Sequence, residues 1–123
     1  MRSLLAAACA AASIALAPAA LAHGEAKARH GGVVQTAHDL GFELVVRGDV
    51  VAIYIEDHGK PVAPAGISGR LTVLNGTDKS EATLTAAGDR LEARGVKIAK
   101  GARVVAALTT ADKKAMTVRF TLR

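Results

Sequence analysis

Apolar and polar side chains alternate residue by residue along much of this chain, and this period of two constrains its fold most strongly. Successive side chains of a β-strand point to opposite faces, so strict alternation predicts strands with one buried and one solvated face. The pattern is clear over residues 42–47, 51–56 and 70–73. It is clearest at the C-terminal end, where apolar residues occupy every second position: Met116, Val118, Phe120 and Leu122.

Turn-forming pairs separate these alternating segments. Gly48-Asp49, Gly88-Asp89 and Lys100-Gly101 interrupt the pattern, and Asn75-Gly76 predicts a type I′ hairpin because that turn needs positive φ at both central residues. Turns about every ten residues predict seven to eight short strands in a small antiparallel β-sandwich, immunoglobulin-like or a related Greek key, over residues 31–123. Residues 111–114 fit either a short helix or a loop.

The first 22 residues have the layout of an export signal. Arg2 precedes an apolar stretch at 4–16, Pro18 breaks that stretch, and Ala20-Leu21-Ala22 provides the small residues that signal peptidase requires. We therefore expect cleavage after Ala22, a periplasmic location, and a flexible N-terminal arm over residues 23–30. Cys9 lies inside the apolar stretch, too early for lipoprotein processing.

The composition of the remaining 101 residues excludes several classes of protein. They suffice for one domain and contain no cysteine, so neither a disulfide nor a thiolate ligand is available. The 15 basic and 11 acidic residues give a net charge of +4, but the basic residues are scattered along the sequence. Nucleic-acid binding needs a basic patch, usually with aromatic residues for stacking, and the only aromatic residues are Phe42, Tyr54 and Phe120.

Four histidines, His23, His30, His38 and His58, are the candidate metal ligands. Imidazole is the commonest metal-binding side chain, and carboxylates follow or precede two of the four rings, at Asp39 and at Asp57. After cleavage, His23 would be the first residue, so that its α-amine and ring could chelate Cu(II) together. The alternative is that His23 belongs to a mobile arm and the other three histidines are exposed residues at a strand entry or in turns.

No pattern in the sequence indicates catalysis. No serine lies in a nucleophile elbow, and the carboxylates are dispersed along solvated strand faces. Met116 is expected in the core, so nitrogen and oxygen donors would have to bind any metal, which favours a divalent ion such as Cu(II) or Zn(II). The sequence therefore predicts that the protein is not an enzyme.

Three segments resemble the periplasmic β-domain associated with adaptor (membrane-fusion) subunits of heavy-metal efflux systems. They are His30-Gly31-Gly32-Val33-Val34-Gln35, then residues 42–45, then residues 51–62 with Asp57-His58-Gly59-Lys60-Pro61. The helical hairpin and lipoyl parts of an adaptor are absent, so the resemblance implies a stand-alone exported protein. It implies a role with divalent metal ions, and His30 and His58 are the histidines that match its motifs.

These observations lead to one expected function and two alternatives. The expected function is a periplasmic divalent-metal-binding or metal-delivery protein, associated with heavy-metal efflux and resistance and in contact with an efflux adaptor subunit. The first alternative is a non-metal interaction module that docks an efflux adaptor or other envelope protein through a strand edge. The second is an enzyme that holds copper at His23.

Overall fold

The computed structural model describes residues 27–123, which form antiparallel strands and no helix. The all-β antiparallel prediction is confirmed. No helix in this range is long and apolar enough to cross a membrane. The strands are β1 (Val33–Ala37), β2 (Leu40–Arg47), β3 (Val50–Asp57), β4 (Lys60–Pro61), β5 (Ser68–Asn75), β6 (Asp78–Ala87), β7 (Arg90–Arg94), β8 (Arg103–Thr109) and β9 (Ala115–Thr121).

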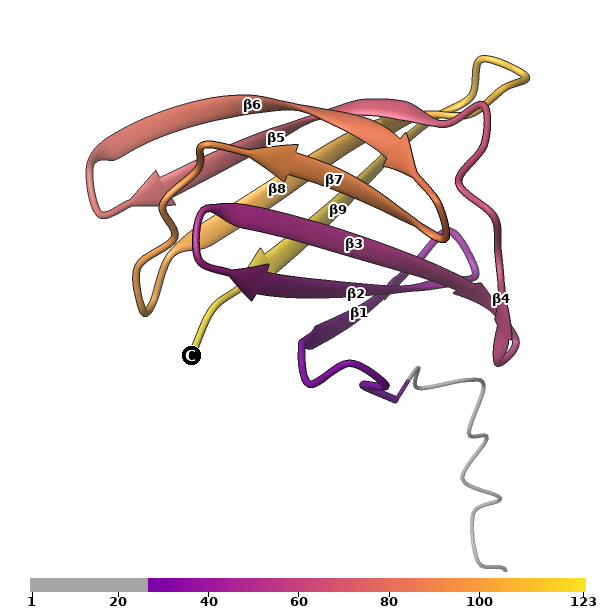
Figure 1. Cartoon of the computed structure of the whole chain (residues 1–123), viewed down its shortest axis with the longest axis horizontal. Helices are drawn as coiled ribbons and strands as arrows, with labels where there is room; N and C mark the ends of the chain where they lie inside the picture. Colours follow the sequence, from indigo (N-terminus) through magenta and orange to yellow (C-terminus); the bar gives the residue numbers. More distant parts are fainter. Residues whose placement is uncertain (1–26) are drawn as a thin grey trace, which may run out of the picture.

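Strand β6 connects the two layers of the fold. The hydrogen-bonded order is β1-β2-β3-β7-β6-β5-β8-β9, and the two-residue β4 pairs with β3. Residues 78–84 of β6 pair with β5, whereas residues 85–87 pair with β7. One layer is therefore β1-β2-β3-β7 and the other is β5-β8-β9. Because β1 also lies against β9, the sheet nearly closes into a barrel (Figure 1).

The connectivity contains a Greek key. Strands β5, β6 and β7 follow one another through tight turns, and β8 then returns to pair with β5, which gives the spatial order β8-β5-β6-β7. Two longer connections make this possible, residues 62–67 before β5 and residues 95–102 before β8. They lie at opposite ends of the molecule (Figure 1).

The alternating apolar residues fill one continuous core between the layers. Phe42, Leu44, Val51 and Ile53 face the core from β2 and β3, and the opposite layer contributes Leu71, Val73, Val104, Val118 and Phe120. The two long connections close its ends, since Val62 and Ile67 pack against the core from one of them and Val96 and Ile98 from the other. The sequence alternation thus identified the buried face correctly on β2, β3, β5 and β9.

The turn at Asn75-Gly76 differs from its prediction. Asn75 pairs with Asp78, so the two loop residues are Gly76 and Thr77, and only Gly76 has positive φ, at 64°. The Asn75 side chain instead holds the connection to β8: its Nδ2 donates to the Lys97 carbonyl at 2.9 Å and its Oδ1 accepts from the Ala99 N–H at 3.0 Å. Residues 111–114 form a loop and no helix.

The side chain of Leu84 is fully buried where β6 passes from one layer to the other. Replacing it tests how much this part of the core contributes to stability. We expect Leu84→Ala to lower the free energy of unfolding by about 2–5 kcal/mol, through lost burial and the cavity left behind. Urea denaturation measures this change. The neighbouring exposed Thr83→Ala should change stability by less than about 0.5 kcal/mol. Equal effects of the two substitutions would contradict this account of the core.

Candidate functional site

Glu43 is the one buried charged residue in the described range of the chain, and it lies on the outer face of β2. Its Oε1 accepts hydrogen bonds from the Arg29 N–H at 3.0 Å and from His30 Nδ1 at 2.9 Å. Its Oε2 accepts from the N–H groups of His30 at 2.9 Å and Gly32 at 2.8 Å. Four donors thus surround this carboxylate and hold the segment that precedes β1 against the sheet.

The two glycines after His30 allow this close approach. Gly31 has φ of +73°, a left-handed conformation that turns the chain toward Glu43. A Cβ at Gly32 would lie 2.2 Å from the Leu44 carbonyl oxygen, so only glycine fits against β2 at this point. The sequence His30-Gly31-Gly32 therefore encodes a backbone path that favours glycine at position 31 and requires it at position 32.

The hydrogen bonds to Glu43 also determine its charge state. Burial by itself raises the pKa of Glu43, but the hydrogen bond from the His30 ring and those from the backbone N–H groups of Arg29, Gly32 and His30 outweigh it. The net pKa is lowered from its ordinary value of 4.5. Because an ionised carboxylate only accepts, His30 Nδ1 must carry the proton of that hydrogen bond.

His30 and Arg29 extend this contact across the sheet. The His30 ring stacks on Tyr54 of β3, with centroids 3.7 Å apart and an interplanar angle of 8°. The guanidinium of Arg90 lies 6.0 Å from the centroid of the Tyr54 ring. Arg29 Nε pairs with Glu56 at 3.1 Å, and its Nη2 donates to the Gly59 carbonyl at 3.1 Å. The N-terminal segment thus contacts β2, β3 and the turn before β4.

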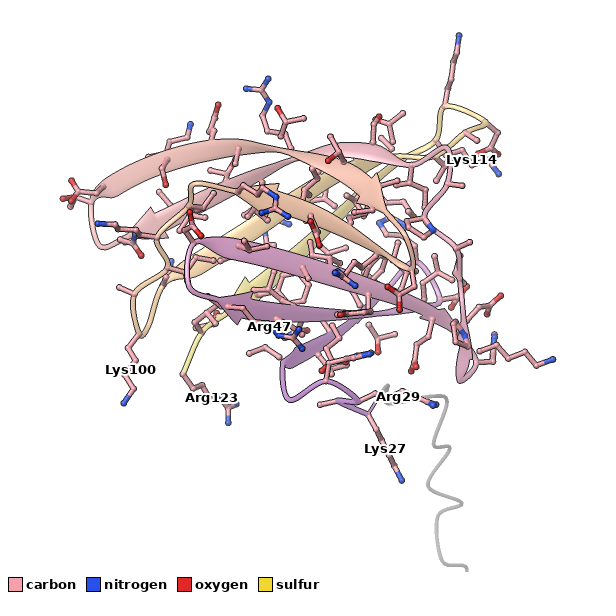
Figure 2. All side chains as sticks on the ribbon, in the orientation of Figure 1. Lys27, Arg29, Arg47, Lys100, Lys114 and Arg123 are labelled. Atoms are coloured by element: carbon pink, nitrogen blue, oxygen red, sulfur yellow. The ribbon has the colours of Figure 1, made fainter. Side chains whose placement is uncertain are left out.

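A pocket of about 230 Å³ lies between this segment and the sheet. Strand pairing places Thr36, Gly41 and Glu56 side by side on the outer face, and the missing side chain at Gly41 leaves space there. Figure 2 shows Lys27 and Arg29 on the segment that precedes β1. The pocket is lined by Lys27, Arg29, His30, Val34, Gly41, Phe42, Glu43, Tyr54, Ile55, Glu56, Pro61 and Asp89.

The three predicted histidines that lie in the described residues do not form one site. His30 lies on Glu43 and Tyr54. His38 is exposed in the β1–β2 turn with φ of 52°, and His58 is exposed in the β3–β4 turn, where its Nδ1 contacts the Asp57 carboxylate. The predicted signal peptide and His23 lie outside the described residues, so export and the His23 chelate stay predictions.

Within residues 27–123, no three His, Cys, Asp or Glu side chains lie where they could hold a metal ion together. Arg29 and His30, expected in a flexible arm, are bound to Glu43 and Glu56. The residues that sequence reasoning missed as a site are Glu43, Tyr54, Arg29 and Arg90. The available indication was a carboxylate between the apolar residues Phe42 and Leu44, on a face where Val45 is also buried.

No protein-family model and no curated protein matches this chain. Among solved structures, it is similar to one described as the crystal structure of a Br derivative of BhCBM56, a carbohydrate-binding module. The identity is 18%, the TM-score is 0.44, and the match covers 73% of this chain and 97% of that chain.

These findings correct the expected function. The three described histidines lie apart and do not converge as metal ligands. The prediction of a divalent-metal-binding or metal-delivery protein is therefore wrong, whereas docking to an efflux adaptor or other envelope protein stays a prediction. The physical reason is that two of the histidines occupy separate hairpin turns, whereas the third is stacked and hydrogen-bonded in another contact.

Replacing Glu43 tests the contact that holds the N-terminal segment. Glu43→Gln removes the charge and introduces an NH₂ group among four donors, so we expect a loss of about 1–3 kcal/mol in unfolding free energy at pH 7. Since the folded pKa is lowered, the stabilisation is present above the ordinary value of 4.5 and disappears as pH falls through the folded pKa.

Urea unfolding of both proteins between pH 7 and about pH 3 measures this dependence, and the stability difference should shrink toward the acidic end. Glu81→Gln is the matched control, because Glu81 forms exposed ion pairs with Arg70 and Lys79 that contribute little. A difference that stays constant with pH would show that the charge of Glu43 does not stabilise the fold.

Gly32→Ala tests the close approach of the segment to β2. The new Cβ would meet the Leu44 carbonyl, so we expect the segment to be displaced and the amides of Arg29, His30 and position 32 to exchange faster with solvent. Hydrogen-exchange NMR measures this. Gly31→Ala is the control: it meets no atom within 4 Å and costs only the left-handed backbone, about 1–2 kcal/mol. Unchanged exchange in Gly32→Ala would contradict the prediction.

Proposed function

We propose that this chain is a non-catalytic binding module whose outer-face pocket takes a small neutral saccharide. One observation carries the proposal: a pocket of about 230 Å³ in which a stacked aromatic pair lies beside both hydrogen-bond donors and acceptors. Binding pockets typically combine an apolar or aromatic wall with a few polar groups that orient the ligand. A sugar presents the matching surfaces, an apolar ring face and a rim of hydroxyls.

The charges in the pocket favour a neutral ligand. Lys27 and Arg29 are the cations of its lining, and Glu43, Glu56 and Asp89 are the carboxylates, so the formal charges of these five groups sum to −1. A free anion would meet three carboxylates, and a cation would have to compete with donors already bound to Glu43 and Glu56. Hydroxyl groups both donate and accept, so they satisfy this mixed lining without adding charge.

The carboxylates of the pocket are already hydrogen-bonded or ion-paired, which supports a binding role without catalysis. Glu43 accepts four hydrogen bonds, Glu56 pairs with Arg29, and Asp89 pairs with Arg90 at 3.1 Å. A general acid or base has to exchange a proton with its substrate. Each of these carboxylates is instead already engaged by a neighbouring donor, which suits positioning of a ligand better than proton transfer.

Tyr54 provides the sharpest test, because one substitution removes its ring and another removes only its hydroxyl. A panel of neutral oligosaccharides is first screened by isothermal titration calorimetry against the folded protein. For a saccharide that binds, we expect Tyr54→Ala to weaken affinity by about tenfold or more, whereas Tyr54→Phe keeps the stacked wall and stays within about twofold. Thermal melting of both variants shows whether the fold is retained.

Two outcomes would overturn the proposal. One is that no neutral saccharide in the panel binds with Kd below about 1 mM, which corresponds to only about 4 kcal/mol of binding free energy. The other is that a folded Tyr54→Ala protein binds its saccharide as tightly as the wild type, which would place the ligand elsewhere on the molecule.

A further inference from the structure

We propose that a second surface, the outer face of β8 and β9, binds an anionic polysaccharide through Arg103, Arg119 and Arg123. This surface, called here the arginine face, belongs to the layer opposite the pocket. The proposal rests on charge and strand register in that layer, so it stands or falls independently of the saccharide pocket.

Charge is distributed very unevenly along the sequence. Residues 95–123, which include β8 and β9, contain one acidic residue, Asp112. The same stretch contains seven basic residues: Lys97, Lys100, Arg103, Lys113, Lys114, Arg119 and Arg123. Strands β8 and β9 themselves carry no carboxylate at all. This part of the molecule therefore presents a positive potential that its own side chains leave largely uncompensated.

Strand register brings the three arginines together on one face. Arg103 of β8 pairs with Thr121 of β9, and both are exposed. Arg119 and Arg123 lie two residues before and two residues after Thr121, so they are the two diagonal neighbours of Arg103 on the same face. Diagonal neighbours in an antiparallel pair are separated by about 7–8 Å. Figure 2 shows Lys100 at the same end of the molecule as Arg123.

These three arginines differ in their partners from four of the five other arginines in residues 27–123; the exception, Arg47, also has no ion pair in this range. Arg29, Arg70, Arg90 and Arg94 each form an ion pair with a nearby carboxylate. Within residues 27–123, the three residues of the arginine face form no ion pair, although they are close to one another. Neighbouring like charges destabilise a sheet. A bound anion would relieve this repulsion, and guanidinium groups bind sulfate and carboxylate oxygens in a bidentate manner.

The side chains around the arginines favour a polysaccharide over other anionic partners. Val105, Ala107 and Thr117 lie between and beside them on the same face, and all three are small. No aromatic ring is available there for base stacking, which single-stranded nucleic acids require. No long apolar side chain projects to insert among lipid chains. The small side chains leave the arginines accessible along the surface. Such a surface suits a linear sugar chain that carries repeated anionic groups.

The test compares two polymers with an uncharged one. Dextran sulfate and polygalacturonate carry sulfate and carboxylate groups respectively, and unmodified dextran carries neither. We expect calorimetry to show that the full protein binds one or both acidic polymers. Its affinity for dextran at this surface should be at least about tenfold weaker than its affinity for the acidic polymer. The double variant Arg103→Gln, Arg119→Gln should weaken binding of the acidic polymer by about tenfold or more.

A charge-matched control separates this surface from net charge. Arg47→Gln with Lys60→Gln also removes two cations, from β2 and β4 in the other layer, and should change affinity by less than about twofold. Equal weakening by the two double variants would overturn the proposal, as would tighter binding to phosphatidylglycerol vesicles than to either polymer. Tyr54→Ala should leave binding of the acidic polymer unchanged, which distinguishes failure at the pocket from failure at the arginine face.

Discussion

The four hydrogen bonds to Glu43 are the interactions on which the candidate site depends. A carboxylate on the outer face of a strand is normally solvated, whereas this one is buried because three backbone N–H groups and the His30 ring replace its water. Once that carboxylate holds the segment before β1, His30 lies on Tyr54 and Arg29 reaches Glu56. The segment thus becomes one wall of the pocket, and without Glu43 the outer face of β2 and β3 would be an open surface.

The Greek-key arrangement explains why that surface is free to hold a ligand. β6 pairs with β5 over one part and with β7 over the rest, so the two layers share a strand and enclose one apolar core. The connections at 62–67 and 95–102 close the two ends of that core with their own apolar residues. Apolar side chains fill the interior between the described strands, and the pocket lies outside this core, on the outer face.

The two outer faces differ in how their charges are arranged. On the face with the pocket, arginines pair with carboxylates, as Arg29 does with Glu56 at 3.1 Å and as Arg90 does with Glu92 of the same strand at 2.9 Å. On the β8–β9 face, Arg103 and Arg119 are diagonal neighbours, and the other side chains around them are small and uncharged. The first arrangement suits a neutral ligand with many hydroxyls, and the second suits a chain of anions. One small domain thereby offers two chemically distinct surfaces, one in each layer.

The sequence alone determined the fold class and the buried face, because the period-two alternation in segments such as 42–47 and 116–122 is a local property of the chain. It could not show that Glu43 binds the N–H groups of residues 29–32, or that Asn75 holds residues 97–99 instead of forming its own turn. The histidines seemed to be one group because they are numerous near the start of the chain, yet hairpin turns separate His38 from His58. Likewise the basic residues are scattered along the sequence, and strand pairing brings Arg103, Arg119 and Arg123 together on one face. These contacts join residues distant in sequence, and only the register of the paired strands decides which side chains become neighbours.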